Sequence, residues 1–231
     1  DPWVGMELAM ITVAALNHRA VTGAGQYIDL SMAEALSASI PEAILDYQMN
    51  GAVPAPQGNR DARDAPHGVY PCQGDDHWIA IAVTNDAEWQ ALCRVLERPD
   101  LAADARLLAA AGRRQHQDEL DAAITAWTRR QQDYTAMHLL QTAGVPAGPS
   151  LDMHRLYHDP QLRAGGYLTP LQTSDGATRE LPGLPWRFVD LEPPHLTAAP
   201  VLGQDNMYVY HELLGLSEAD IVRLAEAQVI Y

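Results

Sequence analysis

The chain has 231 residues, of which 47% are hydrophobic and 19% charged, so it is long enough for a substantial core and has the composition of an ordinary globular protein. Its formal net charge of -15 opposes broad contact with nucleic acid or an anionic membrane surface, because the field of the protein would repel phosphate. All 15 basic residues are arginines, which excludes a Schiff-base lysine or a Walker-type lysine from this stretch.

Hydropathy and cysteine content argue against a membrane-spanning protein and against a disulfide-rich one. The sequence contains no uninterrupted apolar run of roughly 18 to 20 residues, so no membrane-spanning helix is predicted. Cys72 and Cys93 are too few for a disulfide scaffold and too far apart for a C-x-x-C motif. We therefore expect a reducing, cytoplasmic location.

The first fifty residues predict a helix, a strand and a second helix. Apolar residues recur at helical spacing from Gly5 to Val21, which predicts a mostly buried helix that ends near Thr22 and Gly23. The alternation in residues 27–30 predicts a short strand. Ser31 then caps a helix that runs towards Met49, with a capping box completed by the glutamate three residues later. Such an order of elements is typical of α/β proteins.

An irregular loop and a hairpin follow. Residues 50–67 are rich in Gly, Pro, Asn and Asp, and long loops of this kind are commonly functional or disordered. Residues 68–72 and 77–83 predict two strands joined by a turn. Because the hairpin opens a new substructure, we expect a domain boundary near residue 68.

The rest of the chain is mainly helical in prediction, with one break and one extended run. Asp86 is expected to cap a helix that ends near Glu97. A break is expected at 144–149, and a Pro-rich extended run at 182–200. The remaining predicted elements are helices over 115–130, 133–143, 151–158, 207–214 and 217–227, and a strand over 166–170. Ser217 with Asp220 resembles a capping box at the start of the last helix, with Asp in place of the usual Glu.

Asp1 has two compatible interpretations. Aspartate directly before Pro2 is typical of a helix N-cap, because Pro lacks the amide that would go unpaired there. The positive end of a helix dipole also keeps a carboxylate ionised, and an ionised carboxylate can attack a thioester carbonyl. On chemistry alone the capping role is the more common one.

Ordered motifs run along the whole chain. They are Asp1 with Gly5, Thr22-Gly23-Ala24-Gly25-Gln26, Ile28-Asp29-Leu30-Ser31, Gly58-Asn59, Ala65-Pro66-His67-Gly68-Val69-Tyr70, 143–149, Asp159-Pro160, 199–203 and 213–217. The pattern and spacing of these motifs resemble the class III CoA-transferase family of CaiB/BaiF type. In that family the nucleophile occupies the place of Asp1, and a long CoA-binding segment precedes it, so the chain resembles the C-terminal part of a larger enzyme.

The resemblance implies a fold and a domain division. It implies an α/β fold made of the C-terminal part of a large, doubly wound α/β domain and a smaller inserted α/β domain, in two subunits threaded through each other as an interlocked homodimer. Residues 1–68 would finish the large domain and carry the nucleophile helix. Residues 69–185 would form the small domain, and residues 186–231 would return to the large domain or to the partner subunit.

The resemblance also implies an activity, which is acyl-CoA:carboxylate CoA transfer through an aspartyl-CoA thioester on Asp1. Coenzyme A thioesters and a carboxylic acid would be substrates, and no permanent cofactor would be needed. One alternative is a related α-methylacyl-CoA racemase, in which the matching aspartate works with a histidine. Relatives of that branch carry extra glycines after the aspartate, which Pro2-Trp3-Val4 lacks. A second alternative is a noncatalytic fragment or assembly module that needs an N-terminal partner.

Further candidate residues lie in the long loop. Asn59, Arg60, His67 and Gly68 are expected to bind substrate, because the family segment that matches them lies at the active site, and a loop of this composition could close over an acyl-CoA. The run of glycines found there in formyl-CoA transferases is absent, which argues against formyl or oxalyl specificity. His154 and His158 have helical i, i+4 spacing, but no third strong ligand is indicated, so we expect no metal site.

Overall fold

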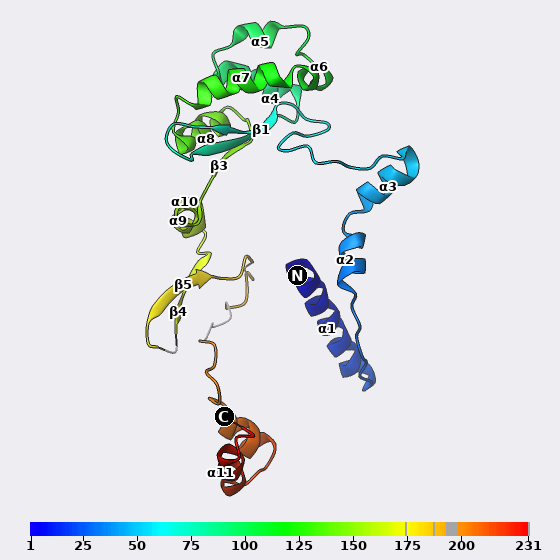
Figure 1. The fold of residues 1–231 in the computed structure, drawn as a ribbon, viewed down its shortest axis with the longest axis vertical. Helices are drawn as coiled ribbons and strands as arrows, with labels where there is room; N and C mark the ends of the chain where they lie inside the picture. Colours follow the sequence, from blue (N-terminus) through cyan, green and yellow to red (C-terminus); the bar gives the residue numbers. More distant parts are fainter. Residues whose placement is uncertain (174, 187, 193–197, 231) are drawn as a thin grey trace.

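The protein has an open, branched shape in three parts (Figure 1). The structure is a computed structural model that describes residues 1–173, 175–186, 188–192 and 198–230. A compact unit carries β1 to β3 and α4 to α8, with an arm of α1 to α3 on one side and an arm that leads to α11 on the other. The Pro-rich run predicted at 182–200 lies partly outside the described residues.

The described helices and strands follow one another along the chain as follows. They are α1 (Pro2–Thr22), α2 (Met32–Ala38), α3 (Pro41–Asn50), β1 (His67–Pro71), β2 (Trp78–Ala82), α4 (Asp86–Val95), α5 (Pro99–Ala103), α6 (Ala110–Gln115), α7 (Gln117–Thr128), α8 (Asp133–Thr142), β3 (Ala147–Ser150), α9 (Met153–Tyr157), α10 (Pro160–Ala164), β4 (Leu168–Gln172), β5 (Thr178–Pro182), the π-helix η1 (Met207–Leu213) and α11 (Glu218–Glu226).

The compact unit is built on a three-stranded antiparallel sheet with the order β1-β2-β3. Tyr70 lies opposite Ile79, and both side chains are buried in the hydrophobic core with residues of α4, α7 and α8. On the alternate positions of the sheet, Ala80 lies opposite Val69 on one side and Gly148 on the other. Because side chains alternate between faces, helices cover the face of this sheet that carries Tyr70 and Ile79, while Val69, Ala80 and Gly148 belong to the other face.

The predicted α/β class is confirmed. The strands that the structure describes form two antiparallel sheets, the second being the pair β4 and β5. The doubly wound sheet of the large domain is not formed within the described residues. The predicted hairpin and the predicted helices over the compact unit are confirmed in place, with ends shifted by a few residues.

Several expectations for the N-terminal arm are wrong. Residues 27–30 form no strand, and Tyr27 is 91% exposed, since no described strand pairs with them. The helix expected from Ser31 to Met49 is interrupted before Pro41, which has no amide to continue the ladder and instead begins α3. The Ser31 cap itself is confirmed, because its side chain accepts a hydrogen bond from the Glu34 amide.

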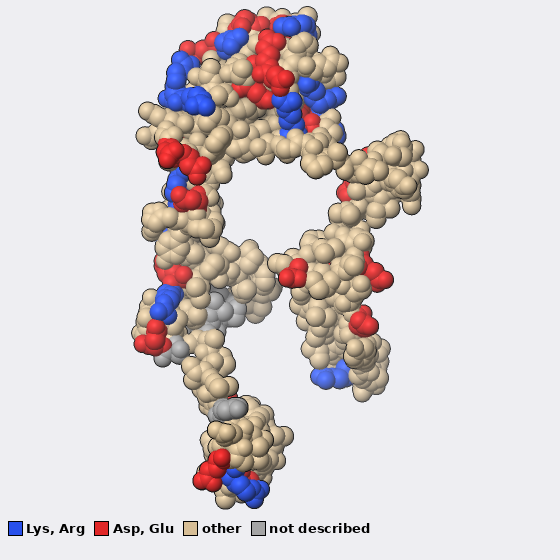
Figure 2. All heavy atoms as spheres, in the orientation of Figure 1, with Lys and Arg blue, Asp and Glu red and all other residues tan. Residues whose placement is uncertain are grey.

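Helix α1 forms as predicted but is not mostly buried. Val4 is its one buried residue, whereas Trp3, Met6, Met10 and Val13 are all exposed. In the space-filling view, charged side chains are dense over the compact unit and sparse over α1 to α3 (Figure 2). The arm therefore presents an apolar surface that the described residues leave open.

The two caps predicted at later helices have different outcomes. The α4 cap is Asn85 rather than Asp86, because Asn85 has the extended backbone and its side chain accepts a bond from the Glu88 amide. At α11 the Ser217 side chain accepts from the Asp220 amide at 3.2 Å and donates to the Asp220 carboxylate at 2.6 Å, which confirms the predicted cap.

Candidate active site

A cavity of about 410 Å³ lies at the sheet surface that the helices do not cover. Its wall consists of loop residues 58–60 and the strand ends at 67–69, 80–82 and 146–148. Most of this lining is apolar and small, and the polar side chains come from Asn59, Arg60 and His67. The structure therefore brings the four predicted substrate-binding residues, with Gly68 as the fourth, to one cavity.

The loop that forms one wall is closed on itself. His67 and Asn59 meet through the Nδ1 of the histidine and the backbone carbonyl oxygen of the asparagine, 2.7 Å apart. Between them, one Asp61 carboxylate oxygen accepts hydrogen bonds from the amides of Arg63 and Asp64 at 2.7 and 3.0 Å. These amide bonds lower the pKa of Asp61, so its carboxylate is ionised at neutral pH.

The exit of the loop is fixed to the compact unit. The carbonyl oxygen of Ala65 accepts from Arg113 Nε at 2.8 Å, that of Pro66 from the Val83 amide at 2.9 Å, and that of His67 from Gln117 Nε2 at 3.2 Å. Ala65 and Pro66 are buried. Residues 59–67 thus act as a fixed wall of the cavity in this structure.

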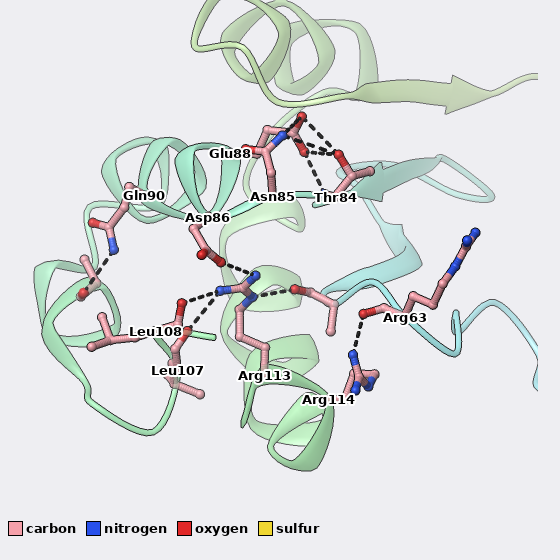
Figure 3. Close-up of polar contacts among 12 residues, drawn as sticks. Arg63, Thr84, Asn85, Asp86, Glu88, Gln90, Leu107, Leu108, Arg113 and Arg114 are labelled. Atoms are coloured by element: carbon pink, nitrogen blue, oxygen red, sulfur yellow. Dashed lines mark hydrogen bonds and ion pairs between the residues drawn. The ribbon is translucent and has the colours of Figure 1, made fainter. Parts of the chain in front are cut away.

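Arg113 is the main support of that wall, and Figure 3 shows its guanidinium between Asp86 and the carbonyls of Leu107 and Leu108. Its side chain is 1% exposed and also lies 5.5 Å from the centroid of the Trp89 ring. Sequence reasoning missed this residue, because an arginine among alanines and a second arginine has the pattern of an exposed helix surface.

Arg60 joins the cavity to α7. Its guanidinium pairs with the carboxylates of Asp118 and Asp121, which lie one turn apart on that helix. Asp121 also accepts a hydrogen bond from the buried Tyr70 hydroxyl at 2.8 Å. Gly68 makes room for this arrangement, since a Cβ atom at residue 68 would lie 2.9 Å from the Tyr70 hydroxyl oxygen.

Asp1 lies apart from the cavity. Its carboxylate is exposed at the N-cap position of α1 and makes no capping hydrogen bond, although its carbonyl oxygen accepts from the Gly5 amide at 2.9 Å. It is not part of the cavity lining, and Figure 1 shows the N-terminus at a distance from β1 and β3. The structure therefore does not bring Asp1 together with the other candidate residues.

The cysteines and the His154–His158 pair show no arrangement for catalysis or metal binding among the residues that the structure describes. Burial raises the pKa of the Cys72 and Cys93 thiols to about 11, so both remain protonated at neutral pH. The rings of His154 and His158 stack edge to face with centroids 4.8 Å apart. In the described part of the chain, no group of three or more His, Cys, Asp or Glu side chains is arranged to hold a metal ion. No described helix is both long and apolar enough to cross a membrane.

Comparison with known proteins gives one consistent result. The sequence profile of CoA-transferase family III matches residues 1–206. The protein named "Probable CoA-transferase Rv1866" of Mycobacterium tuberculosis is 31% identical over 242 residues, which covers 100% of this chain and 29% of that protein. The succinyl-CoA–D-citramalate CoA-transferase of Chloroflexus aurantiacus is 30% identical over 225 residues, which covers 96% of this chain and 55% of the relative.

Solved structures agree with the sequence match. The crystal structure of a CaiB/BaiF family protein from Brucella suis superposes with a TM-score of 0.78 at 26% identity, over 91% of this chain and 54% of the other. The chain thus spans between 29% and 55% of the length of these relatives. With a family profile that matches most of its length, the chain belongs to CoA-transferase family III.

Proposed function

We propose that the protein is an acyl-CoA:carboxylate CoA-transferase that works through an aspartyl-CoA thioester on Asp1. The observation that carries the proposal is that Asp1, within the match to family III, has an exposed carboxylate at the N-terminus of α1 that is not used in capping. At the N-terminus of the 21-residue helix α1, the helix dipole favours the ionised form that can act as a nucleophile.

The proposed reaction has four steps on the same carboxylate. The Asp1 carboxylate attacks the thioester carbonyl of the donor, which gives a mixed anhydride and releases CoA thiolate. The thiolate attacks the aspartyl carbonyl, forms the aspartyl-CoA thioester and releases the donor acid. The acceptor carboxylate attacks this thioester to give a second mixed anhydride and thiolate, and the thiolate then attacks the new acyl carbonyl and regenerates the Asp1 carboxylate.

The first turn of α1 supports this chemistry. The amides of Trp3 and Val4 belong to the first turn, where backbone N–H groups have no intrahelical acceptor. Donors of this kind stabilise the oxyanion of each tetrahedral intermediate. In this proposal Asn59, Arg60, His67 and Gly68 bind substrate in the cavity, whose charge comes from Arg60 and whose small apolar lining accepts an acyl chain.

The names of the relatives suggest which acids to test first. Relatives include a succinyl-CoA–D-citramalate CoA-transferase and a succinate–glutarate CoA-transferase, both of which handle dicarboxylates. A cationic residue in the cavity suits a substrate that keeps one free carboxylate. We therefore propose succinyl-CoA as the first donor to assay, with dicarboxylic acids as acceptors.

We further propose a cytoplasmic interlocked homodimer with the domain division predicted from sequence, except that the loop 59–67 belongs with the small domain, to which it is bonded. The exposed apolar residues of α1, among them Trp3, Met6 and Met10, support an assembly that covers this arm. The free, buried Cys72 and Cys93 are consistent with a reducing compartment. Sedimentation equilibrium tests the assembly, and a monomer at assay concentrations would rule it out.

The test of the catalytic proposal is hydroxylamine trapping followed by peptide mass spectrometry. We expect a hydroxamate on Asp1 after exposure of the purified protein to succinyl-CoA, and none on Asp1→Asn. The exchange of label between CoA and acid should be lost in the same variant. Recovery of unmodified Asp1 from a folded protein that binds CoA would refute transfer and leave a racemase-like or noncatalytic role.

A further inference from the structure

The arginine that lines the cavity is already paired with two carboxylates. Arg60 Nη2 lies 3.1 Å from Asp121 Oδ2 and also bonds to Asp118 Oδ1. Hydrogen bonding to Asp118, followed by that to Asp121, raises the pKa of Arg60. Neither Nε nor Nη1 of Arg60 bonds to any residue within the described ranges. These donors remain for a ligand while Nη2 is held by the protein.

The two aspartates hold Arg60 in different ways. The Asp121 side chain is 30% exposed and is fixed by the hydroxyl of Tyr70, a residue that is 3% exposed. The Asp118 side chain is 92% exposed, and within the described residues its carboxylate bonds to Arg60 alone. Asp121 is therefore an anchored partner, whereas Asp118 is a solvated one whose pairing is weak.

We propose that Arg60 is the anion-binding group of the cavity, that Tyr70 and Asp121 position it there, and that Asp118 competes with the ligand's anionic group for it. This inference rests on the proposed function, which supplies two anions of suitable chemistry. One is the free carboxylate of the acid or acyl group, and the other is a phosphate of CoA. Either anion displaces Asp118 from the guanidinium while Asp121 remains bound.

If Asp118 competes with the substrate, removing its charge should raise the affinity for the substrate instead of lowering it. Asp118→Asn removes the competing charge and leaves the anchoring Asp121 in place. We expect the affinity for the anionic substrate to rise by about two- to fivefold, the range of a typical exposed ion pair. Tyr70→Phe removes the hydrogen bond that holds Asp121, so we expect the affinity to fall while kcat changes less. The fold of each variant is checked by circular dichroism.

The design includes a control for long-range charge effects. Asp100→Asn removes the same charge from an exposed aspartate that pairs with Arg98, and Asp100 does not line the cavity. We expect it to leave KM unchanged. In an Arg60→Gln background, Asp118→Asn should lose its effect, because the group for which it competes is gone.

Steady-state kinetics shows which anion is bound. A lower KM for the acid alone in Asp118→Asn assigns Arg60 to the carboxylate, and a lower KM for the CoA thioester alone assigns it to a phosphate. An unchanged or raised KM for both substrates would overturn the inference. So would an effect that persists in the Arg60→Gln background, or an equal effect of Asp100→Asn.

The two proposals fail in distinguishable ways. A parent protein that transfers CoA normally while Asp118→Asn changes neither KM refutes the inference alone. A parent protein that shows no transfer refutes the proposed function, and calorimetric titration with CoA and with succinate still measures the affinities of the same variants. If the parent binds neither compound, both proposals are wrong.

Discussion

Replacement of Arg113 by methionine is the sharpest test of how the cavity wall is held. The Arg113 side chain is 1% exposed, and it donates to the carbonyls of Ala65, Leu107 and Leu108 at 2.8, 3.1 and 3.0 Å. Methionine occupies a similar volume without donors. The bonds to the Ala65 and Leu107 carbonyls are buried, and a buried carbonyl that loses its partner costs about 1 to 3 kcal/mol, so we expect a loss of roughly 3 to 5 kcal/mol in the free energy of unfolding.

Urea unfolding followed by tryptophan fluorescence and circular dichroism measures this loss. The matched control is Arg114→Met, the same substitution at the neighbouring arginine of α6, whose side chain is exposed and donates to the exposed carbonyl of Arg63. We expect the control to cost less than about 1 kcal/mol. The reasoning is refuted if Arg113→Met costs no more than the control, because the carbonyl bonds would then contribute little.

Two further predictions concern acid stability and close packing. Burial raises the pKa of Asp133, but hydrogen bonds, first from Arg155, outweigh it, so the pKa lies below its ordinary value of 3.8. The ionised carboxylate therefore stabilises the fold above pH 3.8, and this stabilisation is lost as the pH falls through the lower folded-state pKa. In thermal melts between pH 5 and pH 2, the melting temperature should fall more steeply for the parent protein than for Asp133→Asn. Gly112→Ala places a Cβ atom 1.8 Å from the Arg106 carbonyl oxygen and should lower the free energy of unfolding by about 3 kcal/mol or more. The control is Gly5→Ala, which has no atom within 4 Å of the added Cβ and should be neutral or slightly stabilising. Equal melting temperatures for these two variants would contradict the packing.

The sequence predicted those elements whose signals are local. Turn residues and alternation located the hairpin of β1 and β2, and serine followed by an acidic residue located the caps of α2 and α11. The strand expected at 27–30 failed because a strand is completed by a partner, and the pattern of a single segment does not supply one. The exposure of α1 has the same origin, since helical periodicity predicts a helix but not what covers it.

The cavity was predictable in composition but not in geometry. The loop residues Asn59, Arg60 and His67 were selected because their segment resembles one at a family active site, and all three line the cavity. The opposite wall at 146–148 appeared in sequence only as a helix-breaking run, and it becomes part of the site because β3 pairs with β2. Arg113 was not recognisable, since its role depends on carbonyls as far away as residue 65 along the chain.

The bonds of the loop also bear on where the domain boundary lies. The division predicted near residue 68 would separate the loop from the sheet, yet Arg60, Ala65 and Pro66 are bonded to α7, Arg113 and Val83. Residues 59–67 therefore move with the compact unit, and any hinge towards α3 must lie in 51–57, a segment with no regular structure.

With a hinge at 51–57, the shape of the cavity and its position relative to Asp1 depend on different parts of the chain, and the proposed chemistry requires both. Bonds such as that from the Val83 amide to the Pro66 carbonyl help to determine the shape of the cavity, because they join its loop to the end of β2. The segment 51–57 helps to determine where that cavity lies relative to the helix that begins at Asp1, because it is an irregular segment of the chain that joins the two. Changes in 51–57 should therefore alter the encounter of nucleophile and thioester while leaving affinity for the bound acid intact, whereas changes at Arg60 should do the opposite.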